Sequence, residues 1–505
     1  MRNLKLLFVF LCLTTYSLSQ DYINSYDWET PAKLWTVSQS QKNEDEIQLL
    51  KKEICQYVYE NNSLVEYDLF HIRYYLGNKT GIIKNNKVYI PINENEQLIK
   101  TKARVILPGG KIITFDKEDM KEGYEDNVKY NFFALNGLVP GCEVEYIYVI
   151  KTAPNLMGVT YTFQEEDTTY RQSLELISPP NIVLISKSYN GLAEMQKDTS
   201  LAPRNFLKLE LDTVPGLADE PSAFMDKYYQ KVEYKMDRNT IAGKRNIVDY
   251  GKIARTLQQN ANPELTKDDK KALNAIFRAA QLNNKDSAIN NIEALENYLK
   301  TNFVFKTESN PELFSIAAIY KNKAYSELGA IRIYTGICNM LNIKIQPVLT
   351  CDRTETNFDK KFASYNYLQK GLLYFPEIDA YLDPTESSSR LGLIDAEYTG
   401  IVGLHVKTVS MGDYKTGLAV FKVIPTSSAE TNLTDMNIHV TFGDDFDNFS
   451  MHYLTKRYGL INNIIQNYYD KMDDEQKKKF EDNVLKYYDN YQVNNLKIAN
   501  ASPTD

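Results

Sequence analysis

Thiols, imidazoles and carboxylates are the side chains of this sequence that could carry out covalent or acid–base chemistry. Four cysteines follow residue 20, namely Cys55, Cys142, Cys338 and Cys351. The four histidines of the chain are His71, His405, His439 and His452. A thiol attacks an amide as its thiolate, and a paired imidazole lowers the thiol pKa and later protonates the leaving amine. Because no histidine lies between residues 71 and 405, neither Cys338 nor Cys351 has a nearby base in the sequence.

The stretch from Tyr325 to Thr350, which contains Cys338, predicts a long buried helix that leads directly into a strand. Apolar residues recur at helical spacing and fill most of the circumference, and Asn342 ends the helix. The segment that follows is short and apolar enough for a core strand, and Pro347 in it indicates an edge strand or a bulge. Cys338 then falls in the buried stripe of the helix, where a thiol is not activated.

This passage, with LNIKIQPVLT as the break and the strand, resembles the centre of the transglutaminase-like fold, which is related to papain-type thiol enzymes. In that family a cysteine nucleophile begins the helix. Counting back along this sequence places the nucleophile position at Glu327, with Ser326 as the neighbour if the register slips by one. Neither residue is a cysteine, so the resemblance implies that the nucleophile has been replaced.

The family's second and third catalytic residues are a histidine on a following strand and an aspartate in a motif like DPT. The strand is predicted within Ser364–Phe375, where the histidine position falls at Tyr365 or Asn366. The aspartate is Asp383, in Leu-Asp-Pro-Thr. The resemblance thus implies a degenerate site made of Glu327, Asn366 and Asp383, which lacks both the thiol and the imidazole.

These replacements favour a protein without thiol-dependent activity. A carboxylate at a helix start is ordinarily a favourable charge on the helix dipole, worth roughly 0.3 to 1 kcal/mol, and Asp-Pro commonly initiates a turn. The first hypothesis is therefore an exported, non-catalytic binding or scaffold module. Its partner is left open among peptides, proteins and glycans.

Two enzymatic alternatives stay open. In the first, Cys338 or Cys351 is a relocated nucleophile of a transglutaminase or peptidase, with His405 or His439 folding back as its base. In the second, two acids act as a carboxylate-based hydrolase, which needs a pair about 5 to 10 Å apart across a cleft. The candidate acids are Asp352, Glu355, Asp359, Glu377, Asp379 and Asp383.

Composition and the first residues indicate the class of partner and the cellular location of the protein. The net charge of −8 over 505 residues, without a dense basic run, argues against a nucleic-acid partner. Residues 1–19 carry Arg2 and Lys5 ahead of an apolar run and predict a signal peptide, hence a periplasmic, extracellular or surface-associated protein. No later segment is apolar enough to cross a membrane. No metal-ligand spacing or phosphate-binding loop is visible, so neither a metal nor a cofactor is predicted.

We predict a multidomain α+β protein: an N-terminal β-sandwich over residues 20–238, a transglutaminase-like α+β domain over 239–400, and a C-terminal β-rich region with two helices over 401–505. Relatives with this layout usually continue further, so the last region is expected to be shortened or incomplete. The runs LPGGKIITF and FALNGLVPGCEVEYIYV resemble an uncharacterised β-sandwich domain of exported Gram-negative proteins, domain of unknown function 3857. Within it, Gly109-Gly110 predicts a hairpin turn.

Two further local predictions can be compared with the structure. Glu46–Glu60 has the spacing of an amphipathic helix, and Thr266 with Asp269 forms a capping pattern that starts another helix. The four cysteines after residue 20 are interpreted as buried small apolar residues and not as disulfides, since they are few for the chain length and the pair at 338 and 351 would lie too far apart.

Overall fold

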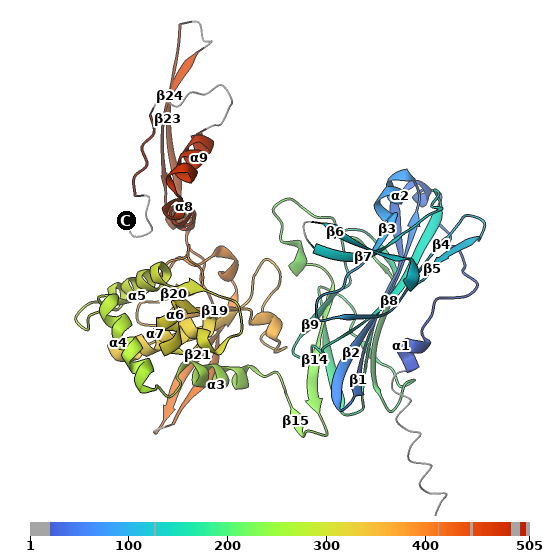
Figure 1. Ribbon diagram of the computed structural model, residues 1–505, viewed down its shortest axis with the longest axis horizontal. Helices are drawn as coiled ribbons and strands as arrows, with labels where there is room; N and C mark the ends of the chain where they lie inside the picture. Colours follow the sequence, from blue (N-terminus) through green and yellow to red (C-terminus); the bar gives the residue numbers. More distant parts are fainter. Residues whose placement is uncertain (1–20, 126–127, 413, 445–447, 486–494, 501–505) are drawn as a thin grey trace, which may run out of the picture. The chain divides into compact units, whose positions relative to one another are not determined.

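The computed structural model describes residues 21–125, 128–412, 414–444, 448–485 and 495–500. The predicted signal peptide at residues 1–19 lies outside the described residues. The chain divides into two compact units, Met1–Val248 and Asp249–Asp505. Strands dominate the first unit, and the second combines helices with sheets, in agreement with the predicted multidomain α+β class (Figure 1).

The first unit contains one large sheet and two small ones (Figure 1). The large sheet has the order β12-β13-β10-β1-β2-β8-β4-β5. Its strands are β1 (Glu46–Glu60), β2 (Ser63–Leu76), β4 (Gln97–Ile106), β5 (Ile112–Phe115), β8 (Cys142–Thr152), β10 (Thr169–Ser178), β12 (Gln196–Lys197) and β13 (Asn205–Val214). The small sheets join β3 (Lys87–Ile90), β7 (Val128–Ala134) and β6 (Met120–Glu125), and β9 (Val159–Thr162), β11 (Ile182–Tyr189), β14 (Lys231–Asn239) and β15 (Lys244–Arg245).

Both faces of the large sheet are covered. On one face, the strands β1, β10 and β13 share a core with β9, β11 and β14, and the strands β2, β4 and β8 share another with β3 and β7. A third core lies on the other face and joins Ile23 of the short helix α1 (Asp21–Ser25) to Ile54 and Leu69. Helix α2 (Lys79–Asn85) follows β2 and begins at the side-chain cap of Asn78. The central strands are therefore buried on both sides, one of which also carries buried charged residues such as Glu145, Glu175 and Arg104.

The helix predicted over Glu46–Glu60 is wrong, because this segment is strand β1. It pairs with β2 along its length through a turn at Asn61 and Asn62, whose φ angles are +48° and +65°. Two consecutive left-handed residues make the turn that antiparallel hairpins favour. Strand β1 is buried on both faces, so its apolar residues do not alternate cleanly and their spacing also fits a helix. The Gly109-Gly110 turn is confirmed, with φ angles of +97° and +88° between β4 and β5.

In the second unit, five helices accompany a five-stranded antiparallel sheet of order β20-β19-β18-β21-β22. The helices are α3 (Tyr250–Ala261), α4 (Lys267–Ala279), α5 (Ala288–Asn302), α6 (Ile316–Asn322) and α7 (Glu327–Leu341). The strands are β18 (Gln346–Thr350), β19 (Lys370–Phe375), β20 (Ala380–Leu382), β21 (Val402–Met411) and β22 (Tyr414–Val423). A short parallel pair joins β16 (Val304–Phe305) to β17 (Ala324–Tyr325). The predicted capping box of Thr266 and Asp269 does begin α4.

The predicted passage from a buried helix into a strand is confirmed in α7 and β18. Asn342 ends α7 in the left-handed conformation, with a φ angle of +58°. Pro347 indicated an edge strand or a bulge, but strand β18 lies between β19 and β21 and is therefore not an edge strand. Its pairing with β21 starts only at Val348, so Pro347 has one neighbouring strand, and its missing N–H costs no ladder bond on the other side.

The C-terminal part contains the predicted strands and helices. Strands β21 and β22 belong to the sheet of β18, which therefore takes strands from both sides of residue 400. A separate hairpin joins β23 (Thr434–Phe442) to β24 (Phe449–Arg457), and the helices are α8 (Leu460–Lys471) and α9 (Asp474–Leu485). Asp473 and Gln476 cap α9. No helix in the described part of the chain is long and apolar enough to span a bilayer.

Candidate functional site

Glu327 lies in the first turn of α7, as the resemblance implied for the nucleophile position. Ser326 is the N-cap of this helix: its Oγ accepts from Gly329 N at 3.3 Å and donates to the Leu313 carbonyl at 3.1 Å. The Glu327 side chain reaches across to strand β19, where its Oε2 accepts the backbone N–H of Gly371 at 2.8 Å. Gly371 is required by this contact, because a Cβ there would stand 2.5 Å from the Glu327 carboxyl carbon.

Asp383, the predicted third member, follows β20 and is fully buried. Its Oδ2 lies 2.6 Å from the Nζ atom of Lys370, the residue directly before Gly371. Its Oδ1 accepts from the Thr385 N–H and hydroxyl, both at 2.8 Å, and from Glu386 N at 3.1 Å. These contacts pair the Asp383 carboxylate with the Lys370 ammonium and fix the turn that Asp383 starts.

Glu327 and Asp383 are brought to the same end of strand β19 by the Lys370-Gly371 dipeptide. Burial raises the pKa of the Glu327 carboxyl, the Gly371 N–H and the Lys370 charge oppose that shift, and the Asp383 charge adds to it. One ammonium is therefore placed among carboxylates, and it lies over the Tyr398 ring at 5.1 Å as well. The charged groups of this site are thus paired with one another, and the side chains that make these contacts include neither a thiol nor an imidazole.

Asn366, the predicted replacement of the family's histidine, lies before β19 and not on it. The strand expected from Ser364 begins only at Lys370, and residues 365–367 form a 3-10 turn. Ser364 Oγ accepts the Asn366 backbone N–H at 3.1 Å. Glu327 and Asp383 are instead connected by Lys370 and Gly371, the first two residues of strand β19.

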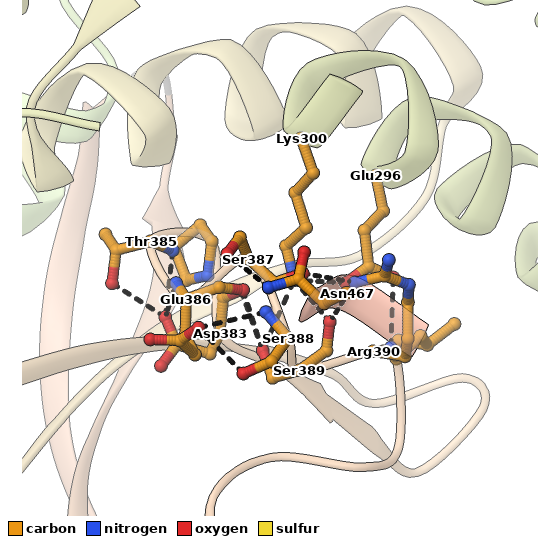
Figure 2. A network of polar contacts seen from close by, with 12 residues as sticks. Glu296, Lys300, Asp383, Thr385, Glu386, Ser387, Ser388, Ser389, Arg390 and Asn467 are labelled. Carbon is orange, nitrogen blue, oxygen red and sulfur yellow. Dashed lines mark hydrogen bonds and ion pairs between the residues drawn. The ribbon is translucent and has the colours of Figure 1, made fainter. Parts of the chain in front are cut away.

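A buried network fixes the segment that follows Asp383 (Figure 2). Lys300 on α5 donates to Glu296 at 2.6 Å and to the Ser389 carbonyl at 2.7 Å. The other Glu296 oxygen accepts Leu391 N at 3.0 Å. Arg390 closes the turn by donating to the Ser387 and Ser389 carbonyls. Figure 2 shows the Lys300 and Glu296 side chains descending from α5 onto this segment, which they hold in place.

The cysteines that could act as relocated nucleophiles are enclosed in cores. All four described cysteines are free and buried, in agreement with their interpretation as apolar residues. Cys338 lies in the core between α7 and its neighbours, where burial, and then the Glu377 charge, raise the pKa of its thiol to about 12. Cys351 lies in another core with Leu404, whereas His405 is the next residue of β21 and points to the opposite face of the sheet. The fold therefore separates Cys351 from that imidazole.

The acids proposed for a carboxylate hydrolase serve local structure. The Asp352 side chain accepts from Thr354, and Asp359 accepts from the backbone of Lys361 and Phe362. Tyr374 donates to Asp379 at 2.7 Å, and Glu377 forms an exposed pair with Lys344 at 3.4 Å. Near Asp383, burial and then the charges of Glu386, Asp383 and Glu397 raise the pKa of the Asp395 carboxyl to about 6.

Two further features could hold a small ligand or an ion. One is a pocket of about 110 Å³ next to β20, which is lined by Asp379, Tyr381, Ile394 and neighbouring residues. In the first unit, the side-chain ligand atoms of Cys55, Glu66 and Asp68 lie within 4.8 Å of one another. The Cys55 thiol donates to Glu66 at 3.0 Å, and burial raises its pKa well above the usual range. The three side chains are linked by hydrogen bonds from the Cys55 thiol.

Sequence reasoning missed Lys370, Glu296 and Lys300. Lys370 follows Gln369 at the start of an apolar run, where a lysine usually marks a solvated strand end. Glu296 and Lys300 have the spacing of an exposed helix ion pair, yet their side chains are only 1% and 5% exposed. Nothing in the local pattern distinguishes such a pair from a surface one, since burial depends on the segment that packs over the helix.

Comparisons with known proteins are consistent with parts of this description. Residues 69–215 match the family "Domain of Unknown Function with solved-structure structure (DUF3857)", so a DUF3857 domain is present. A crystal structure of a "putative protease" from Parabacteroides distasonis shares the fold over 79% of this chain and 78% of its own, with a TM-score of 0.50 and 12% identity. A structure described as a TGase is 9% identical and covers 43% of this chain and 51% of its own, with a TM-score of 0.19. No curated protein matches the chain.

Proposed function

We propose that the second unit is a transglutaminase-like domain that has lost its catalytic residues, and that the exported chain is a non-catalytic binding or scaffold protein. The observation that carries this proposal is the pairing at the helix start. Glu327 accepts a hydrogen bond from the Gly371 N–H, and Asp383 forms an ion pair with Lys370. Both acids at the family's positions are occupied by internal contacts, so the site is used to hold α7, β19 and β20 together.

The chemistry of the replacements supports the same conclusion. A carboxylate is a far weaker nucleophile toward amides than a thiolate, and a charged ammonium has no lone pair with which to accept a proton. Lys370 therefore cannot take over the role of an imidazole beside Asp383. The burial of Cys338 and the opposite orientations of Cys351 and His405 disfavour the alternative of a relocated thiol.

The partner is proposed to be a peptide, a protein or a glycan outside the cytoplasm. Export rests on Arg2 and Lys5 ahead of the apolar run in residues 1–19. The DUF3857 match and the fold shared with the Parabacteroides distasonis protein support a two-part protein with a transglutaminase-like second unit. A binding role agrees with a site whose shape is kept by Glu296, Lys300 and the turn after Asp383.

The proposal is tested by activity and binding measurements on the chain without residues 1–19. We expect no amine incorporation into casein and no peptide hydrolysis, with or without iodoacetamide. Turnover that iodoacetamide blocks, or that Cys338→Ser or Cys351→Ser abolishes, would overturn the non-catalytic assignment. Turnover lost in Asp379→Asn or Asp383→Asn and insensitive to iodoacetamide would instead support the carboxylate-based alternative.

The binding role is tested on peptide and glycan arrays. Lys370→Glu and Lys344→Glu make the same charge change, the first beside Asp383 and the second in an exposed ion pair. A ligand of the former catalytic site is expected to lose affinity with Lys370→Glu and to keep it with Lys344→Glu. Equal affinities of both variants, with folding verified by circular dichroism, would place the binding surface elsewhere.

A further inference from the structure

Strands β23 and β24 form a hairpin (Figure 1). Two of the four histidines of the chain lie on it, at directly opposed positions. The antiparallel register pairs His439 of β23 with His452 of β24. Residues paired directly across antiparallel strands have Cβ atoms about 4.5 to 5.5 Å apart and project from the same face. Both histidines are exposed. Their side chains thus project from the same face of the hairpin and are open to solvent.

The strand alternation places this pair on the face opposite most of the apolar residues of the hairpin. Met436, Ile438, Val440 and Phe442 lie on one face of β23. His439 lies on the other face, between Asn437 and Thr441, whose partners across the strands are Leu454 and Ser450. The neighbours of the pair on this face are therefore three polar residues and the exposed Leu454.

The other two histidines are placed quite differently. His71 is buried, with Tyr26 on Nδ1 at 2.7 Å and Glu145 on Nε2 at 2.8 Å. His405 is fully buried beside Tyr381, and burial, together with the Lys422 charge, lowers its pKa to about 4. Neither ring is accessible to an ion from solution. Any binding of an imidazole-seeking ion to the described residues must then involve the exposed pair.

We propose that His439 and His452 form a two-histidine site for a transition-metal ion of the Zn²⁺, Ni²⁺ or Cu²⁺ class. Imidazole nitrogen is a preferred ligand of these ions, at about 2.0 to 2.1 Å for zinc. The spacing of directly paired residues allows both rings to contact one ion. Water would complete the coordination shell.

Such an ion would fasten the two strands of the hairpin to each other. A two-stranded hairpin on its own is marginally stable in water, and every residue of β23 is exposed. An ion that binds only the folded hairpin stabilises it by mass action, by an amount that grows with the free metal concentration. The site therefore couples the stability of the pairing between β23 and β24 to the free metal concentration.

The test is calorimetric titration of the untagged chain with Ni²⁺ alone. We expect one saturable site per chain that Mg²⁺ does not occupy, because Mg²⁺ prefers oxygen ligands. His439→Ala and His452→Ala should each weaken binding by about tenfold or more, since losing a ligand costs at least as much as losing a residue that merely orients one. Thr441→Ala, on the same face, is the matched control and should bind Ni²⁺ like the original chain.

Limited proteolysis gives a second readout that a distant metal site would not move. Ni²⁺ should slow cleavage within residues 434–457 of the original chain and of Thr441→Ala, and not of either histidine variant. The proposal is overturned if the chain shows no saturable Ni²⁺ binding, or if both histidine variants bind Ni²⁺ as tightly as the original chain does.

Discussion

The ammonium of Lys370 lies 2.6 Å from the buried Oδ2 atom of Asp383, and the residue after Lys370 gives its backbone N–H to Glu327. A lysine and a glycine on one strand thereby join the two acids that the sequence resemblance places at the nucleophile and aspartate positions of the transglutaminase-like pattern. The contribution of these contacts to the free energy of unfolding can be measured with single substitutions.

Lys370→Met is expected to destabilise the second unit by about 3 kcal/mol, because it leaves the Asp383 charge buried without its partner. Lys344→Met also removes an ion pair, but that pair is exposed and should contribute about 0 to 1 kcal/mol. Urea unfolding of both variants measures the difference. Equal small losses would mean that the hydrogen bonds from Thr385 and Glu386 suffice to hold Asp383.

Lys300→Met tests a buried ion pair against an exposed one of the same spacing. Lys300 and Glu296 are i,i+4 neighbours on α5 with side chains 5% and 1% exposed, whereas Lys479 and Glu475 on α9 are 69% and 78% exposed. We expect a loss of about 3 to 5 kcal/mol for Lys300→Met and of at most about 0.5 kcal/mol for Lys479→Met. Thermal and urea unfolding provide the comparison, and similar losses in both variants would contradict it.

Gly371→Ala is expected to cost about 1 to 3 kcal/mol, because the new methyl group overlaps the Glu327 carboxylate. Removing that carboxylate with Glu327→Ala should make the same glycine substitution much less costly. The double-mutant cycle therefore predicts a positive coupling between the two positions, measured by unfolding of the single and double variants. Additive effects would show that the methyl group meets another obstacle.

Glu53→Gln should change the pH dependence of the first unit. Burial raises the pKa of the Glu53 carboxyl from 4.5 to about 7, with Lys51 opposing the shift and Glu66 adding to it. Between these two pH values the unfolded chain binds fewer protons than the folded one, so stability falls as the pH rises from 4.5 to 7 and is constant above. The variant lacks this loss and should be more stable at pH 8, by up to about 3 kcal/mol.

The matching control for Glu53 has the opposite sign. Glu210 has a lowered pKa, chiefly because Lys208 donates to its carboxylate. Its stabilising effect is present above its unfolded pKa and disappears as the pH falls, so Glu210→Gln should lose a little stability at neutral pH and none in acid. Unfolding midpoints at pH 4.5 and pH 8 distinguish the two variants. A Glu53→Gln variant that is no more stable at pH 8 would contradict the assigned burial effect.

Much of the second unit could be predicted from local patterns. The apolar spacing of α7, the left-handed Asn342 after it and the Thr266 capping box depend on interactions within one or two turns of chain, so the residues themselves determine them. Glycine turns such as Gly109-Gly110 belong to the same class. Strand β1 was missed because a strand covered on both faces loses the alternation that marks a strand.

The sequence by itself determined that no histidine lies between residues 71 and 405, and where Glu327 and Asp383 lie along the chain. Only the tertiary structure decided what those acids contact. Lys370 and Gly371 reach them because β19 lies between β18 and β20 in the sheet, and Glu296 with Lys300 is buried because the segment after Asp383 packs on α5. Such contacts join residues 13 to 95 positions apart, and no local spacing encodes them, since they depend on how separate elements pack.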